Sequence, residues 1–145
     1  MKALIQRVSS AKVEVESTIV GEIDQGLLVF IGIEKYDELA EADKMIKRLL
    51  SYRIFYDTDD KMNLSVSDIK GGVLLVSQFT LVADTNSGTR PGFSTAKPPK
   101  EAEELYNYFV HQMQKAHDTV ATGMFGADMQ VSLTNDGPVT FLLKC

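Results

Sequence analysis

The chain has 145 residues, 44% hydrophobic and 24% charged, a composition that excludes a disordered or fibrous protein and indicates a single domain over residues 1–145. Twenty acidic residues against fifteen basic ones give a net charge of −5, which disfavours non-specific binding of nucleic acid. The single cysteine, Cys145, excludes an intrachain disulfide and a thiolate metal cluster, and the longest apolar stretch, Leu27–Ile33, is far shorter than the roughly 20 residues that span a membrane. Because no signal-peptide pattern is present either, we expect a cytoplasmic protein with no membrane partner.

The first segments of the chain predict β-strands. Apolar and polar residues alternate along Ala3–Val15, with an irregularity at Ser9–Ser10, and Thr18–Ile23 can pair back on this strand. Leu27–Ile33 is apolar on both faces of a pleat, which predicts a strand in the middle of a sheet, covered on both sides.

Two amphipathic helices are expected next. Between Asp37 and Tyr52 apolar residues recur at three- and four-residue steps, with acidic residues early and basic residues late, as the helix dipole favours. The second helix begins near Pro99, a residue suited to the first helical turn. Their expected buried residues are Leu39, Ala42, Ile46, Leu49 and Leu50 in the first helix, and Ala102, Leu105, Phe109, Met113 and Ala116 in the second.

The rest of the chain predicts more strands and one long loop. Arg53–Tyr56 reads as a short strand, and Val73–Val76, continuing into Ser77–Leu81, reads as a second buried strand. Ala83–Lys97, rich in Gly, Pro and small polar residues, predicts an ordered but irregular loop long enough to be functional. Strands are expected again on both sides of a turn at Asn135–Pro138. The sum is an α+β fold in which two helices cover an antiparallel or mixed sheet.

The sequence lacks the residue patterns that metal binding, nucleotide binding and a catalytic triad require. There is no ligand pair at metal spacing, and Gly71–Gly72 is a simple turn rather than a phosphate-binding loop, so we expect no metal and no cofactor. His111, expected on the surface, and His117 lie on or just after the second helix. A triad with Ser77 or Thr80 therefore has little support. Short basic clusters that could meet a nucleic acid are Lys44, Lys47 and Arg48, and Arg90, Lys97 and Lys100.

Two polar segments remain as candidate functional sites. Ser77–Thr80 lies where a buried strand meets solvent, but hydrogen bonds at a strand end explain its hydroxyls equally well. Asn135–Thr140 reads equally well as a hairpin turn, and a cis Gly137–Pro138 bond has about a one in twenty chance from base rates alone.

Taken together, Ser77-Gln78-Phe79-Thr80-Leu81 and Asn135-Asp136-Gly137-Pro138-Val139-Thr140 closely resemble the paired signature of the D-aminoacyl-tRNA deacylases, also called D-tyrosyl-tRNA deacylases. Essentially the whole chain is similar to this family. Further matching stretches, in the same order and spacing, are Ala3–Val8, Gly26–Leu28, Arg53–Phe55, Lys61–Asn63, Arg90–Pro91 and Phe125–Val131. Combined with the predicted elements, the resemblance implies sheets that form a partly closed barrel covered by two main helices.

The resemblance implies a substrate and an assembly. The expected reaction is hydrolysis of the ester joining a D-amino acid, or mischarged glycine, to the 3′-terminal adenosine of tRNA, while L-aminoacyl groups are rejected. The expected assembly is a homodimer with the active site at the interface. There Gly137–Pro138 of one subunit, as a cis peptide, would enter the pocket formed by Ser77–Thr80 of the other, so that backbone carbonyls exclude an L side chain.

The resemblance also assigns roles to single residues. Ser77, Gln78 and Thr80 are the expected catalytic residues, with Thr80 the natural nucleophile. No base for Thr80 is evident, so we expect the ribose 2′-hydroxyl and a positioned water to supply much of the rate by proximity. The expected substrate-binding residues are Phe79, Phe125, Met129, Gly137 and Pro138, and Arg7 is expected to support the cis turn.

Two other functions fit the same residues. A Ser/Thr-nucleophile esterase acting on small molecules would need a general base hidden in the fold and would show an acyl-enzyme burst. A non-enzymatic dimeric binding module would use the Ser77 strand and the Gly137 turn only as an interface.

Overall fold

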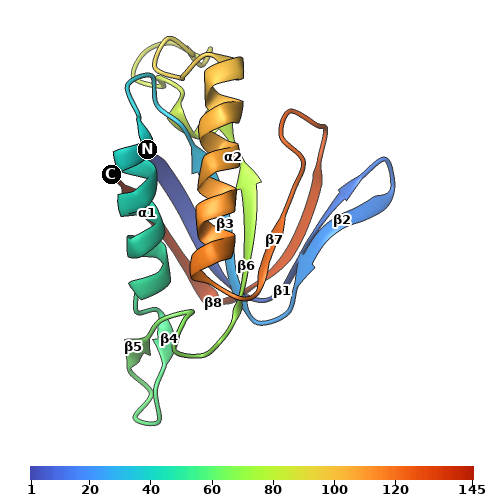
Figure 1. The fold of residues 1–145 in the computed structure, drawn as a ribbon, viewed down its shortest axis with the longest axis vertical. Helices are drawn as coiled ribbons and strands as arrows, with labels where there is room; N and C mark the ends of the chain where they lie inside the picture. The colour runs from blue at the N-terminus through green and yellow to red at the C-terminus, as the bar shows by residue number, and fades with distance from the viewer.

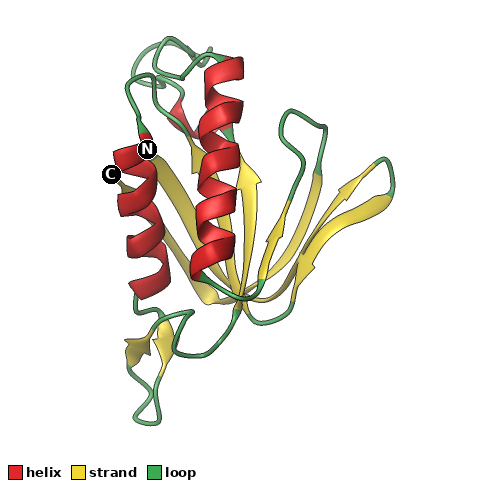
Figure 2. Ribbon diagram, viewed as in Figure 1, coloured by secondary structure: helices red, strands yellow, loops and turns green.

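The computed structural model describes residues 1–145 as a curved mixed sheet, two helices packed side by side on one of its faces, and a small separate hairpin (Figures 1 and 2). Neither helix has the length and apolar character that crossing a membrane requires. The elements in chain order are β1 (Lys2–Val15), β2 (Thr18–Ile23), β3 (Gly26–Gly32), α1 (Leu39–Ser51), β4 (Phe55–Tyr56), β5 (Met62–Leu64), β6 (Gly72–Ser77), the 3-10 turn η1 (Phe79–Val82), α2 (Pro99–Ala116), β7 (Val120–Thr122) and β8 (Gln130–Lys144).

The sheet is built around β1, which pairs with three other strands. Residues 2–8 of β1 pair with β3 and residues 11–15 pair with β2, while β8 pairs along most of β1. Beyond β3 the order continues through β6 to β7, both parallel to their neighbours. β2 curls back so closely toward β7 that a Cβ on Gly21 would collide with the carbonyl oxygen of Thr122. The sheet is thus nearly closed into a barrel, which confirms the predicted fold class.

Alternate residues of β3 face two separate hydrophobic cores. Leu27, Val29 and Ile31 belong to a cluster of 22 buried residues that also contains the inner faces of both helices. Leu28 points to the opposite side, into a cluster of seven buried residues within the curl of the sheet. The prediction of a central strand covered on both faces is therefore confirmed.

The helices begin and end close to where the charge and proline patterns predicted. Pro99 occupies the first turn of α2, and Glu38 and Glu41 form a capping box at the start of α1. Two predictions of buried residues are wrong, because Leu39 and Ala116 are the first and last helical residues and are exposed beyond the core. The buried residues are Ala42, Met45, Ile46 and Leu49 in α1, and Leu105, Tyr106, Phe109 and Met113 in α2.

The structure corrects the turn predicted in the last third of the chain. The chain does not reverse there, because β8 pairs with β1 in the same antiparallel sense on both sides of residues 136–139. Thr140 pairs with Gln6 and Asn135 pairs with Val8, so that five residue steps of β8 lie opposite two steps of β1. The surplus residues form a bulge on the strand, which we call the 136–139 bulge.

Candidate functional site

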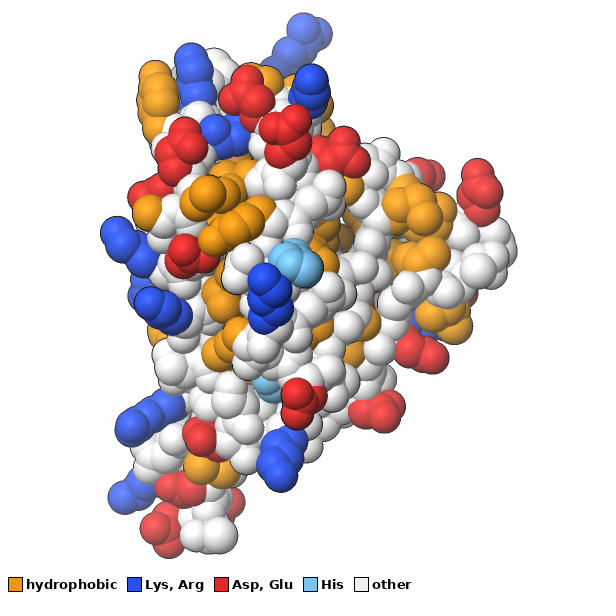
Figure 3. Space-filling model, viewed as in Figure 1, with side chains coloured by type: hydrophobic (Ala, Val, Ile, Leu, Met, Phe, Trp, Pro, Cys, Tyr) orange, Lys and Arg blue, Asp and Glu red, His pale blue; other side chains and the backbone are white.

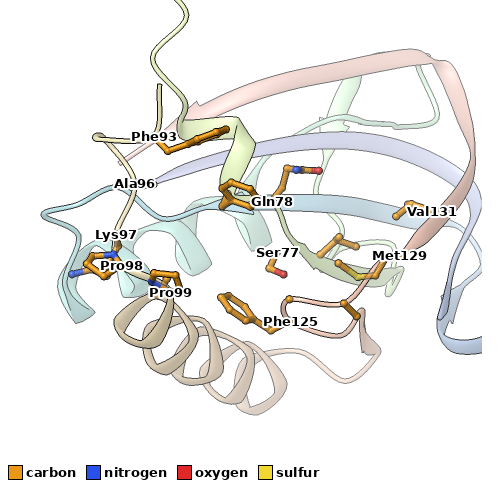
Figure 4. Close-up of a pocket in the computed structure, with 15 residues that line it drawn as sticks. Ser77, Gln78, Phe93, Ala96, Lys97, Pro98, Pro99, Phe125, Met129 and Val131 are labelled. Atoms are coloured by element: carbon orange, nitrogen blue, oxygen red, sulfur yellow. The ribbon is translucent and has the colours of Figure 1, made fainter. Parts of the chain in front are cut away.

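A cavity of about 640 Å³ lies beyond the carboxyl end of β6 (Figure 4). Its walls come from the end of β6 and the start of η1, from the loop before α2 with the first turn of α2, and from the segment between β7 and β8. Sites at the carboxyl ends of parallel strands are common, because the strands diverge there and loops enclose the space. Of the expected site residues, Ser77, Gln78, Phe79, Phe125 and Met129 line this cavity.

The end of β6 positions the first signature motif. The backbone N–H of Gln78 donates to the carbonyl of Ile31 at 2.7 Å, which continues the pairing with β3 by one residue before η1 begins. Ser77 and Gln78 are half-buried in the cavity wall. The Gln78 side-chain amide donates to the hydroxyl of Thr80. Thr80 itself is exposed and does not line the cavity, so the structure links Thr80 to the cavity only through Gln78.

The opposite wall is supported from α2. The ring of Phe125 packs against the ring of Tyr106, with centroids 5.6 Å apart. Tyr106 is buried, its hydroxyl donates to the carbonyl of Leu75 at 3.1 Å, and burial raises the pKa of this phenol far above its usual range. Tyr106 therefore remains a neutral hydrogen-bond donor that fixes Phe125 relative to β6. Met129 lies on the same wall, where its Sδ accepts the backbone N–H of Met124 at 3.4 Å.

Lys97 is the one titratable residue in the cavity lining, and its charge is already paired. Its side chain is 7% exposed, and its Nζ lies 3.9 Å from carboxylate oxygens of both Glu38 and Glu101. Its backbone N–H donates to the carbonyl of Ile33 at 3.1 Å. Lys97 thus connects the loop before α2 to the starts of both helices and is not a free cation of the predicted basic cluster.

The other basic residues singled out from the sequence are exposed. Lys44, Lys47 and Arg48 lie on the outer side of α1, Arg90 lies within the loop before α2, and Lys100 lies in the first turn of α2. Over the face that carries the helices, basic and acidic side chains both surround exposed hydrophobic groups, with several basic groups along the left edge (Figure 3). With a net charge of −5, the molecule as a whole does not attract a polyanion from a distance.

The second signature motif forms the 136–139 bulge, and Arg7 lies opposite it on β1. Although charged, Arg7 is only 3% exposed. Its Nε donates to the carbonyl of Asp136 at 3.0 Å, its Nη1 donates to the carbonyl of Ile54 at 2.8 Å, and its guanidinium lies 4.6 Å from the ring centre of Tyr56. Arg7 therefore joins the bulge to the segment that follows α1.

Gly137 is the residue of the bulge that no other amino acid can replace without strain. Its φ is +138°, and a Cβ there would lie 2.7 Å from the Cγ2 of Val139 and 3.1 Å from the Nη2 of Arg7. The Gly137–Pro138 bond is cis, as the resemblance implied. Both residues are exposed, and neither lines the cavity of its own chain.

Asn135 is a structural residue of this motif to which the sequence analysis assigned no role of its own. Its Oδ1 accepts the backbone N–H of Val139 at 2.9 Å, and its Nδ2 donates to the hydroxyl of Thr140 at 2.8 Å. Asn135 thus bridges the base of the bulge. This role could have been predicted, because Asn side chains often form hydrogen bonds with nearby backbone groups in turns.

Comparison with known proteins matches almost the whole chain. A model of the family described as D-Tyr-tRNA(Tyr) deacylase matches residues 4–144. Similar proteins include the D-aminoacyl-tRNA deacylases of Pseudomonas fluorescens strain Pf-5, 60% identical, and of Cellvibrio japonicus, 58% identical, each over 99% of both chains.

Two solved structures share the fold. The c-Myc DNA unwinding element binding protein superposes with a TM-score of 0.96 at 39% identity, over 100% of this chain and 99% of its own. A probable eukaryotic D-amino acid tRNA deacylase gives a TM-score of 0.88 over 99% of this chain and 98% of its own. At 15% identity, this second likeness concerns the fold alone.

Proposed function

The chain belongs to the D-Tyr-tRNA(Tyr) deacylase family, and we propose that it hydrolyses the ester bond between a D-amino acid and the 3′-terminal adenosine of tRNA. It is a hydrolase, and since aminoacyl-tRNA is made and used in the cytoplasm, we propose that it acts there. The observation that carries this function is that five of the expected site residues, from two distant parts of the sequence, line one cavity.

The cavity suits an aminoacyl nucleoside. Its volume of about 640 Å³ lies within the range of roughly 300–1,000 Å³ typical of sites for small molecules. Phe125 and Met129 offer apolar surface to the base and the ribose, whereas Ser77 and Gln78 offer a hydroxyl and an amide to the aminoacyl group. The proposed substrate thus meets an apolar wall and a polar wall.

For the chemical step we propose positioning rather than a covalent intermediate. The polar side chains of Ser77 and Gln78 orient the ester, and Thr80 acts by holding the Gln78 amide. The ribose 2′-hydroxyl is adjacent to the ester in the substrate itself, so holding it beside the carbonyl and a water molecule gives a large effective concentration.

We propose further that the enzyme is a homodimer and that each site uses both subunits. Residues 136–138 of the bulge are exposed, and Leu133, Phe141 and Leu142 of the same strand expose apolar surface at 36%, 38% and 47%. A second copy could cover these side chains while its cavity receives Gly137 and Pro138. Backbone carbonyls of the bulge would then exclude an L side chain. Glycine has no side chain to exclude, and its ester would be hydrolysed as well.

The reaction is tested by incubating the protein with the same tRNA charged with D-tyrosine, L-tyrosine or glycine and measuring ester loss in a single turnover. D-Tyrosine and glycine should be released, whereas L-tyrosine should remain attached. Equal loss of both enantiomers, or a burst that leaves an acyl-enzyme, would favour a general esterase. No ester loss at all would favour a binding module.

The shared site is tested by mixing two defective subunits. A subunit with Gly137→Ala keeps its cavity, and a subunit with Phe125→Arg, whose long charged side chain obstructs the cavity, keeps its bulge, so a mixed dimer contains one complete site. Random mixing of equal amounts makes about half of the dimers mixed, and each mixed dimer has one working site out of two. About a quarter of the wild-type activity should therefore return. If both halves of the site came from the same subunit, mixing would restore nothing.

A further inference from the structure

Two exposed aromatic rings meet at the edge of the cavity. Phe79, on η1, is 62% exposed, and Phe93, in the loop before α2, is 42% exposed. Their ring centroids are 5.1 Å apart with planes inclined by 50°, and both residues line the cavity. Figure 4 labels Phe93 in this lining. Large aromatic side chains left in contact with solvent are typical of binding surfaces, because their faces gain most by being covered.

The loop that carries Phe93 is fixed by backbone hydrogen bonds. Asp84 and Gly92 exchange two N–H···O bonds of 2.8 and 2.9 Å just before Phe93. Just after it, Thr95 donates its hydroxyl to the carbonyl of Val82 and accepts the backbone N–H of Lys35 at 2.9 Å. The backbone that carries Phe93 is therefore fixed before any ligand binds, so that less conformational entropy is lost on binding.

We propose that Phe79 and Phe93 stack the unpaired base that precedes the terminal adenosine of the tRNA. This inference rests on the proposed function. Because the cavity has room for one aminoacyl nucleoside, the preceding nucleotide must lie at its edge, where the two rings are. Aromatic rings stack on any base and are the common device by which proteins hold single-stranded nucleic acid.

The charge of the surroundings suits this occupant. Arg90 is exposed in the same loop, three residues before Phe93, and Lys100 is exposed in the first turn of α2. The one carboxylate of the loop, Asp84, already accepts the backbone N–H of Asn86 at 3.0 Å. Glu101, the carboxylate beside Lys100, lies 3.9 Å from Lys97 and is paired with it. Arg90 and Lys100 are thus the cations that the two segments offer to a phosphate next to the stacked base.

The test compares two substrates that differ only in the preceding nucleotides, D-tyrosyl-adenosine and D-tyrosyl-tRNA. Phe93→Ala should raise KM for the tRNA by about 5- to 50-fold with kcat unchanged, and should change KM for the adenosine ester by less than about twofold. Phe93→Trp, which keeps a stacking face, should restore the low KM. Tyr36→Ala, which removes an 83% exposed aromatic ring outside the cavity, is the matched control and should change neither value.

Three results would overturn the proposal. If Phe93→Ala raised KM equally for both substrates, Phe93 would contact the nucleoside itself. If KM were unchanged for both, no base would contact the ring. If the substitution changed the molecular mass of the protein in solution, the two rings would be a contact between subunits. Binding of the uncharged trinucleotide CCA is a readout that does not require hydrolysis. Should the wild-type protein bind CCA more tightly than adenosine through Phe93 and yet release no D-tyrosine, the proposed function would fail and the stacking would stand.

Discussion

The cavity and the 136–139 bulge are built in opposite ways. The cavity is concave, lined mainly by apolar side chains from several segments, and supported by the buried contact of Phe125 with Tyr106. The bulge exposes its main chain at residues 136–138 and is held by directional hydrogen bonds with Arg7 and Asn135. Shortening one lining side chain leaves the other walls of the cavity in place, whereas a change at Gly137 or Arg7 displaces the backbone of the bulge as a whole. Single substitutions should therefore have larger effects at the bulge.

Gly137→Ala should have the largest effect. The added Cβ cannot be accommodated at φ +138° between Val139 and Arg7, so the bulge must shift. A displacement of about 1 Å at a site can lower the rate by about 100-fold, and we expect at least this loss in kcat/KM for D-tyrosyl-tRNA. The melting temperature should change much less than the activity, because Gly137 and Pro138 are exposed and Val139 is the one residue of the bulge that belongs to a hydrophobic cluster. Activity within threefold of the wild type would contradict the proposed role of the bulge.

Arg7→Lys should have the next largest effect. Lysine keeps the charge but cannot reach the carbonyls of both Ile54 and Asp136, and one buried acceptor is left without a donor. We expect the free energy of unfolding in urea to fall by about 1–3 kcal/mol and deacylation to fall by about 10- to 100-fold. The exposed Arg53 supplies the control, since Arg53→Lys should alter neither quantity. If the two lysine variants behave alike, Arg7 does not hold the bulge.

Phe125→Leu should have a smaller effect, confined to binding. Leucine retains most of the apolar surface but loses the aromatic contact with Tyr106. Steady-state kinetics should show KM raised by about 2- to 10-fold and kcat preserved. A fall in kcat with unchanged KM would mean that Phe125 acts on the reaction itself rather than on the nucleoside.

Thr80→Ala should have the smallest effect. Thr80 is exposed, and its hydroxyl contacts the Gln78 amide rather than the cavity. The loss of one neutral hydrogen bond corresponds to about 2- to 10-fold in the single-turnover rate. A loss of several orders of magnitude would instead make Thr80 the nucleophile and contradict catalysis assisted by the ribose hydroxyl.

The two regions also differ in how far the sequence predicts them. The polar end of the buried strand at Ser77 was predicted correctly, because a buried strand ends where its apolar residues give way to polar ones. That change is visible in the local sequence pattern alone. The bulge was mistaken for a turn because Asn, Asp, Gly and Pro favour both. Whether a turn or a bulge forms depends on the pairing of β8 with β1, and the residues of this segment alone do not predict that pairing.

The burial of Arg7 and of Lys97 could not be predicted for a related reason. The partners of Arg7 lie 47 and 129 residues away along the chain. Those of Lys97 include Glu38, on the helix cap of α1. An isolated cation in a sequence is most often solvated, and only the assembled fold supplies its partners. Phe93 was missed because a loop without periodicity gives no indication of which side chains face a cavity.

The pairing of β1 with β8 gives the molecule a particular order of assembly. α1 and α2 form from neighbouring residues, whereas β1 must wait for a strand made at the other end of the chain. Contacts between residues so distant in sequence form slowly. During synthesis, Arg7 leaves the ribosome long before Asp136, and the edge of β1 stays open until β8 docks. The structure that would recognise handedness is thus completed late, and a nascent chain lacks it.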